Sequence, residues 1–116
     1  MLVPIKRFGT TLRWSDATVH RGVAYVVEVP TTLPADARAQ SEEVLAQLEA
    51  TLLKVGSAKD QLLMCTIYLA DMADRVVFNE VWDAWLVPGT APVRACIQVG
   101  LADLGYKVEI QVMAAV

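Results

Sequence analysis

The segment 92–100 reads Pro92-Val93-Arg94-Ala95-Cys96-Ile97-Gln98-Val99-Gly100, and the segment 107–110 reads Lys107-Val108-Glu109-Ile110. Apolar and β-branched residues at alternate positions predict a strand in each segment. Each predicted strand carries one charged residue within its apolar run, Arg94 in the first and Glu109 in the second. A charge in a mostly buried strand costs free energy unless it is paired or used. Two interpretations stay open. Arg94 and Glu109 have only a structural role, as an ion pair or as solvated side chains, or they form a functional site.

Length and composition predict a single domain over 1–116 that associates with copies of itself. Apolar residues make up 55% of the 116 residues, and the mean hydropathy is +0.42. A domain of this size has too little interior for so much apolar surface, so a subunit interface is expected. No apolar run approaches the roughly 20 residues that span a bilayer, so no membrane partner is expected. The net charge of −3 argues against nucleic acid as a partner.

The rest of the chain predicts an α+β fold in which a mixed sheet is packed by two helices. Strands are predicted over 4–8, 17–20, 23–29 and 61–69, in addition to the two segments quoted above. Helical spacing of apolar residues predicts helices over 35–55 and 73–86. Asp36 is the predicted N-cap of the first helix, whose apolar stripe is Val44, Leu45, Leu48, Leu52 and Leu53.

Few residues have side chains that would serve in catalysis, metal binding or ligand binding. The only histidine, His20, adjoins a predicted hairpin turn and is interpreted as solvated. Cys65 and Cys96 lack the spacing of a zinc site, so no metal is expected. Two free thiols in a cytoplasmic protein are favoured for them, and a disulfide stays open. Arg94 remains as a bidentate clamp for a carboxylate, and Glu109 as a group that holds or activates a water molecule.

These residues resemble the signature of the Rid family (YjgF-type, reactive intermediate deaminases). The specific part is Pro92 to Ile97, followed by Gly100, Ala102 and Val108-Glu109-Ile110. Weaker similarity extends over nearly the whole chain, in Arg13-Trp14-Ser15-Asp16-Ala17, Gly56-Ser57, Thr66 to Met72, Asn79 and Trp82.

The resemblance implies a fold, an assembly and an activity. The fold would be a chorismate-mutase-like two-layer sandwich, assembled as a homotrimer with a central barrel and with clefts between subunits. The activity would be hydrolysis of reactive imines and enamines, above all 2-imino acids, to 2-keto acids and ammonia without a cofactor. Arg94 would bind the substrate carboxylate with help from the backbone N–H of Cys96. Glu109 would position the attacking water.

Two positions depart from the family pattern. Trp14 stands where the archetype has a tyrosine that enters the cleft, and an indole cannot act as a phenol does. Val27-Glu28-Val29 replaces a Ser-Gly-Gln run, so a hydroxyl is lost and a carboxylate is gained. If Glu28 enters the cleft, it would weaken binding of anionic imino acids or select a substrate with a positive group. The alternative function is a trimeric protein that binds small carboxylates, keto acids among them, without turning them over.

Overall fold

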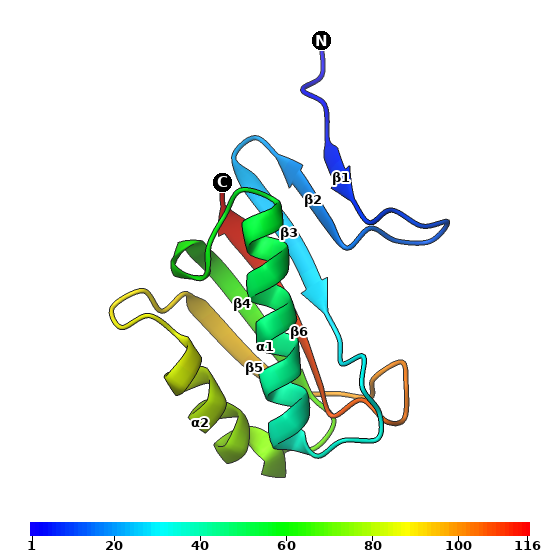
Figure 1. The fold of residues 1–116 in the computed structure, drawn as a ribbon, viewed down its shortest axis with the longest axis vertical. Coiled ribbons are helices and arrows are strands. Elements are labelled where there is room, and N and C mark those ends of the chain that lie inside the picture. Colours follow the sequence, from blue (N-terminus) through cyan, green and yellow to red (C-terminus); the bar gives the residue numbers. More distant parts are fainter.

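The computed structural model describes residues 1–116 as a six-stranded mixed sheet with two helices on one face (Figure 1). The strand order is β1-β2-β3-β6-β4-β5, and every neighbouring pair is antiparallel except β4 with β5. The predicted α+β class and the predicted order of strands and helices are confirmed. The strands are β1 (Lys6–Phe8), β2 (Ala17–His20), β3 (Val23–Glu28), β4 (Leu62–Leu69), β5 (Val93–Gln98) and β6 (Val108–Ala115); the helices are α1 (Ala37–Lys54) and α2 (Arg75–Trp85).

The hydrophobic core lies between the sheet and the helices. Side chains alternate between the two faces of a strand, so β6 buries every second residue: Val108, Ile110, Val112 and Ala114. Helix α1 supplies the opposing layer, beginning at Asp36, whose side chain accepts a hydrogen bond from the Ala39 N–H at 2.8 Å. Val44, Leu45, Leu48 and Leu52 are buried as predicted, whereas Leu53 is exposed because its position turns it away from the sheet. No helix has both the length and the apolar character needed to cross a membrane.

The second face of the sheet, called the open face from here on, has no cover within the chain. Its side chains come from the alternate residues of the same strands. It is notably apolar, and the exposed large side chains on it are Tyr25, Val27, Val93 and Ile97. The residues of β4 on the open face, Met64, Thr66 and Tyr68, are only half-buried.

The two signature strands are not neighbours, because β4 lies between them. Parallel strands need a crossover connection, usually a helix; here α2 makes that crossover and places β5 beside β4. The last strand then pairs with the other edge of β4. Register puts Arg94 opposite Cys65, on the helix-covered face, and Glu109 opposite Tyr68, on the open face. An ion pair between Arg94 and Glu109 is therefore excluded within the chain.

Gln40 fixes the loop between β5 and β6 to helix α1. Its buried side chain donates hydrogen bonds to the carbonyl oxygens of Ala35 (3.0 Å) and Gly105 (2.9 Å) and accepts one from the Lys107 N–H (2.8 Å). One amide thus satisfies three main-chain groups, including two from the loop that leads into Glu109.

Replacing Gln40 by Leu should lower the free energy of unfolding by about 3 kcal/mol, because buried donors and acceptors are left unpaired. Urea denaturation at fixed protein concentration measures this. Gln61→Leu is the matched control: Gln61 is exposed and its side chain bonds only to the adjacent Asp60, so the expected change is under about 0.5 kcal/mol. Equal destabilisation by the two variants would contradict the role given to Gln40.

Candidate functional site

Arg94 is held by two neutral side chains of helix α2. Its Nη2 donates to Asn79 Oδ1 at 2.9 Å, and its Cζ lies 5.4 Å from the centre of the Trp82 ring. Asn79 and Trp82 are three residues apart, so they lie on the same side of α2. The chain contains two ion pairs, Arg38–Glu80 and Lys59–Glu49, and neither involves Arg94. The guanidinium is thus held in one orientation, is exposed to solvent and has no carboxylate partner. These are the properties of a binding group for an anion.

The backbone beside Arg94 also presents donors. Strand β5 is the outermost strand, with β4 on one side only. The Val99 N–H donates to the Leu69 carbonyl oxygen of β4 at 3.0 Å. Because successive N–H groups point to alternate sides of a strand, the N–H of Cys96 points to the free edge of β5. The Arg94 side chain and the Cys96 N–H therefore lie at the same edge of the sheet.

The two cysteines are free thiols, as favoured from the sequence. Burial raises the pKa of the Cys65 thiol to about 12, although the nearby Arg94 acts in the opposite direction. A thiol with such a pKa stays protonated and is a poor nucleophile. The side chain of Cys96 is half-buried on the helix-covered face, so its contribution at the free edge is the main-chain N–H.

Glu109 lies on the open face, in a hollow of about 310 Å³. Partial burial raises the pKa of its carboxyl group, which makes no hydrogen bond within the chain. The cross-strand neighbour Tyr68 lines the same hollow and donates from its hydroxyl to Gln111 Oε1 at 2.9 Å. The alternation of β6 puts Gln111 on the same face as Glu109, a signal present in the sequence. The position of Tyr68 depends on the β4–β6 register, which the sequence analysis did not predict.

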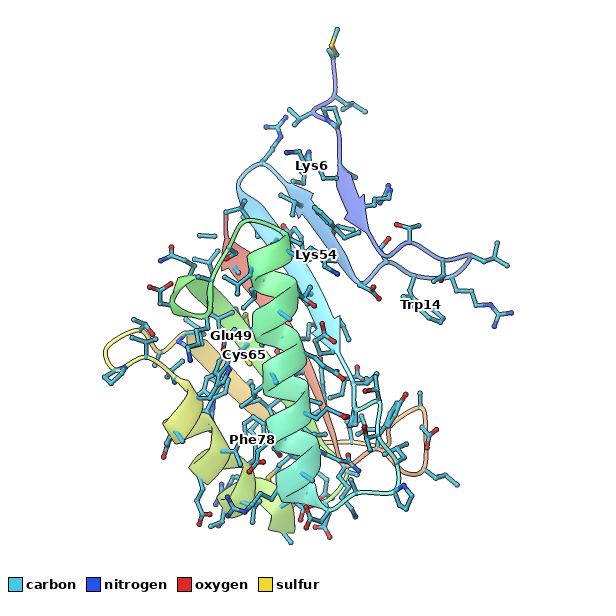
Figure 2. The ribbon with its side chains drawn as sticks, in the orientation of Figure 1. Lys6, Trp14, Glu49, Lys54, Cys65 and Phe78 are labelled. Carbon is cyan, nitrogen blue, oxygen red and sulfur yellow. The ribbon has the colours of Figure 1, made fainter.

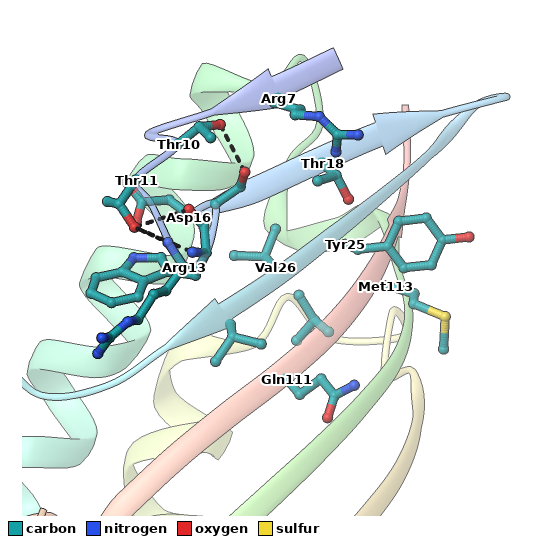
Figure 3. Close-up of a pocket in the computed structure, with 14 residues that line it drawn as sticks. Arg7, Thr10, Thr11, Arg13, Asp16, Thr18, Tyr25, Val26, Gln111 and Met113 are labelled. Atoms are coloured by element: carbon teal, nitrogen blue, oxygen red, sulfur yellow. Dashed lines mark hydrogen bonds between the residues drawn. The ribbon is translucent and has the colours of Figure 1, made fainter. Parts of the chain in front are cut away.

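A second, larger hollow of about 660 Å³ lies under the loop between β1 and β2. Figure 3 shows Tyr25, Gln111 and Met113 reaching into it from β3 and β6, with Thr18 and Arg7 beyond them. Trp14 and Val27 also line this hollow. The Trp14 side chain is 62% exposed, and Figure 2 places it on the loop, away from the helices. Gln111 lines both hollows, so Trp14, Val27 and Glu109 all belong to the open face.

Glu28 does not face either hollow. It lies on the helix-covered face of β3, where its carboxylate accepts hydrogen bonds from Thr51 Oγ1 at 2.6 Å and Gln47 Nε2 at 3.4 Å. Burial raises the pKa of Glu28, the bond from Thr51 opposes that rise, and the charge of Asp16 adds to it. The sequence left open that Glu28 enters the cleft. Adjacent residues of a strand point to opposite faces, so Glu28 faces α1 whereas Val27 lies on the open face. Glu28 fastens β3 to α1.

The candidate residues thus form two groups that one chain keeps apart. Arg94 and the Cys96 N–H lie at the β5 edge beside α2, and none of the hollows includes Arg94. Glu109, Trp14 and Val27 lie on the open face. No group of three histidine, cysteine or acidic side chains is placed to hold a metal ion.

Comparison with known proteins agrees with the fold and with the family signature. The family model described as Endoribonuclease L-PSP matches residues 4–116. The RutC family protein YoaB of Escherichia coli K12 is 47% identical over 112 residues, covering 97% of this chain and 98% of its own. A RutC family protein of Haemophilus ducreyi is 41% identical over 97% of each chain. The crystal structure of NMB1025, a YjgF family member from Neisseria meningitidis, is 40% identical with a TM-score of 0.93 and covers 97% of this chain and 94% of that one.

A second solved structure, described as a putative translation initiation inhibitor from Salmonella typhimurium, is 46% identical with a TM-score of 0.90 and covers 97% of both chains. The family match spans nearly the whole chain, including both signature strands and both groups of candidate residues. On this evidence, the chain belongs to the endoribonuclease L-PSP family, the family of the YjgF and RutC proteins.

Proposed function

We propose that this protein hydrolyses reactive imines and enamines, converting 2-imino acids to 2-keto acids and ammonia, in clefts between the subunits of a homotrimer. The observation that carries the proposal is Arg94, a cation held in place by Asn79 and Trp82 without any carboxylate of its own. Family membership supports the same kind of role. The net charge of −3 gives no support to RNA as a substrate, which the family description alone would suggest.

Arg94 and the Cys96 N–H suit the carboxylate of an imino acid. A guanidinium binds a carboxylate through two parallel N–H donors, and a neighbouring main-chain N–H adds a third. Stacking on Trp82 and the bond to Asn79 fix the plane of the guanidinium before substrate arrives, so little conformational entropy is lost on binding. The bound carboxylate in turn fixes the position of the imine carbon.

Assembly brings the two groups of residues together in this proposal. The open face is apolar and uncovered, and the β5 edge of one subunit would pack over the open face of the next. Such a head-to-tail contact closes into a ring when the rotation between subunits allows it, and three copies would enclose a central barrel. Each cleft would then contain Arg94 from one subunit and Glu109, Trp14 and Val27 from its neighbour.

Hydrolysis of an imine requires little of the protein beyond the correct placement of the substrate and a water molecule. A protonated imine is already an electrophile, so the protein needs to hold it beside a water molecule and accept a proton. Glu109 has the raised pKa of a partly buried carboxyl and no competing donor. It is therefore suited to take a proton from water and return it to the leaving nitrogen.

A second candidate, binding of small carboxylates without turnover, is favoured by one observation. Trp14 and Val27 bring no hydroxyl group to the larger hollow. The first assay below separates the two functions, because a binder would be stabilised by keto acids without accelerating imine loss.

Arg94→Ala should reduce imine hydrolysis by about 100-fold, because a charged, bidentate contact to the carboxylate is lost. An amino-acid oxidase would generate imino acids from a panel of amino acids, and semicarbazide would trap what survives. Arg75→Ala is the matched control, since Arg75 is exposed at the start of α2 and makes no side-chain hydrogen bond. Cys96→Ala keeps the main-chain N–H and should retain activity. Full activity of Arg94→Ala would refute the proposal.

Mixing two inactive variants tests whether each cleft uses two subunits. Arg94→Ala and Glu109→Gln, unfolded and refolded together in equal amounts, should recover about a quarter of wild-type activity, because about one cleft in four receives both intact residues. Each variant refolded alone is the control. No recovery from mixtures shown to contain both chains would mean that one subunit supplies both groups.

Glu28→Gln should leave the charge preference for substrates unchanged, because residue 28 faces α1. It should instead remove a pH dependence of stability. The pKa of Glu28 is raised in the folded chain, so the folded state binds the proton more tightly and stability falls as pH rises from the ordinary carboxyl range through the raised pKa. Urea denaturation of both proteins at pH 4.5 and pH 7 measures the difference. A changed substrate preference in the variant would contradict this placement.

A further inference from the structure

We propose that Tyr68 is a catalytic residue of this cleft: its phenolic oxygen and the Glu109 carboxylate together hold the attacking water. The inference rests on the proposed function and assigns to Tyr68 a role at the same site. It follows from the pairing of β4 with β6.

Tyr68 and Glu109 are directly opposite each other in register and point to the open face. Opposite residues of an antiparallel pair have Cβ atoms about 5 Å apart, so the two side chains leave the sheet side by side. Both line the hollow of about 310 Å³, and no other charged side chain lines it. Gly100, at its rim, has no atom within 4 Å of where a Cβ would lie, so space for a substrate remains there.

The hydrogen bond from Tyr68 to Gln111 decides how the phenol behaves. Because the hydroxyl proton is directed to Gln111 Oε1, the lone pairs of the Tyr68 oxygen are left to accept. Glu109, when ionised, also only accepts. A water molecule between them donates both of its hydrogens, which leaves a lone pair for the imine carbon.

The reaction balances with these groups alone. The water lone pair forms the C–O bond while the π electrons of the protonated imine move to nitrogen, and Glu109 takes one proton from the water. Glu109 returns this proton to nitrogen, the C–N bond breaks with its electrons on nitrogen, and the carbonyl forms. The remaining hydroxyl proton passes through Glu109 to ammonia, which leaves as ammonium. The Tyr68 oxygen holds the water during the first step and is itself unchanged.

Other aromatic groups cannot take this place in the chain. Trp14 has only an N–H to donate and lines the larger hollow, and Tyr25 lines that hollow as well. Tyr106 lies in the β5–β6 loop and lines a separate hollow. Tyr68 is the one phenol that shares a hollow with Glu109.

Tyr68→Phe removes only the phenolic oxygen and keeps the ring. The expected result is a fall in kcat of about tenfold with KM nearly unchanged, since Arg94 still binds the carboxylate. Tyr106→Phe is the matched control and should keep wild-type values. A wild-type kcat in Tyr68→Phe, with Arg94→Ala inactive, would overturn the role of Tyr68 and leave the proposed function standing. Absence of imine hydrolysis by the wild-type protein would overturn both.

Gln111→Leu gives a second measurement with the opposite sign. Without its acceptor, the Tyr68 hydroxyl turns to donate to Glu109, so the pKa of Glu109 falls and the acidic limb of the kcat profile moves to lower pH. In Tyr68→Phe the water is less well held, and the pKa of Glu109 rises. Carbon NMR of the Glu109 carboxyl follows both shifts without any substrate. A purely structural role for Tyr68 predicts the same Glu109 titration in all three proteins, and that result would overturn the proposal.

Discussion

The parallel pairing of β4 with β5 is the constraint on which the rest of the structure depends. It requires the α2 crossover, and α2 brings Asn79 and Trp82 against Arg94. It also leaves β5 as an edge strand with free N–H groups, Cys96 among them. Finally, it leaves the other side of β4 to β6, which sets Glu109 opposite Tyr68. One pairing thus determines the surroundings of both charged residues.

The charges of Arg94 and Glu109 both stay unpaired within the chain. Arg94 is fixed by an amide and an indole, and Glu109 has no donor, so neither charge is neutralised inside the chain. An ion pair within the chain would have stabilised the fold at the expense of this availability. The nearby charges that serve structure are treated differently: Arg38 pairs with Glu80, and Glu28 is bonded by Thr51 and Gln47.

Sequence reasoning predicted what depends on local pattern. Alternation gave the strands, helical spacing gave the helices, and Asp36 was identified as a cap because capping involves only the next three residues. It failed where the outcome depends on which strands meet. An ion pair between Arg94 and Glu109 was left open, although β4 separates their strands. Glu28 was considered for the cleft because the run Val27-Glu28-Val29 replaces a Ser-Gly-Gln run of the family pattern. The position of Tyr68 beside Glu109 rests on register between segments some 40 residues apart, which no local pattern encodes.

The unpaired edge of β5 has a consequence for the aggregation of this chain. An unpaired strand edge that carries exposed Val93 and Ile97 is a template for adding any other extended segment. Charged residues or a bulge commonly blunt such an edge, but the only charged residue of β5 is Arg94, whose side chain lies on the helix-covered face. A chain that presents this edge to solvent is therefore open to aggregation by strand addition, whatever the stability of its own fold.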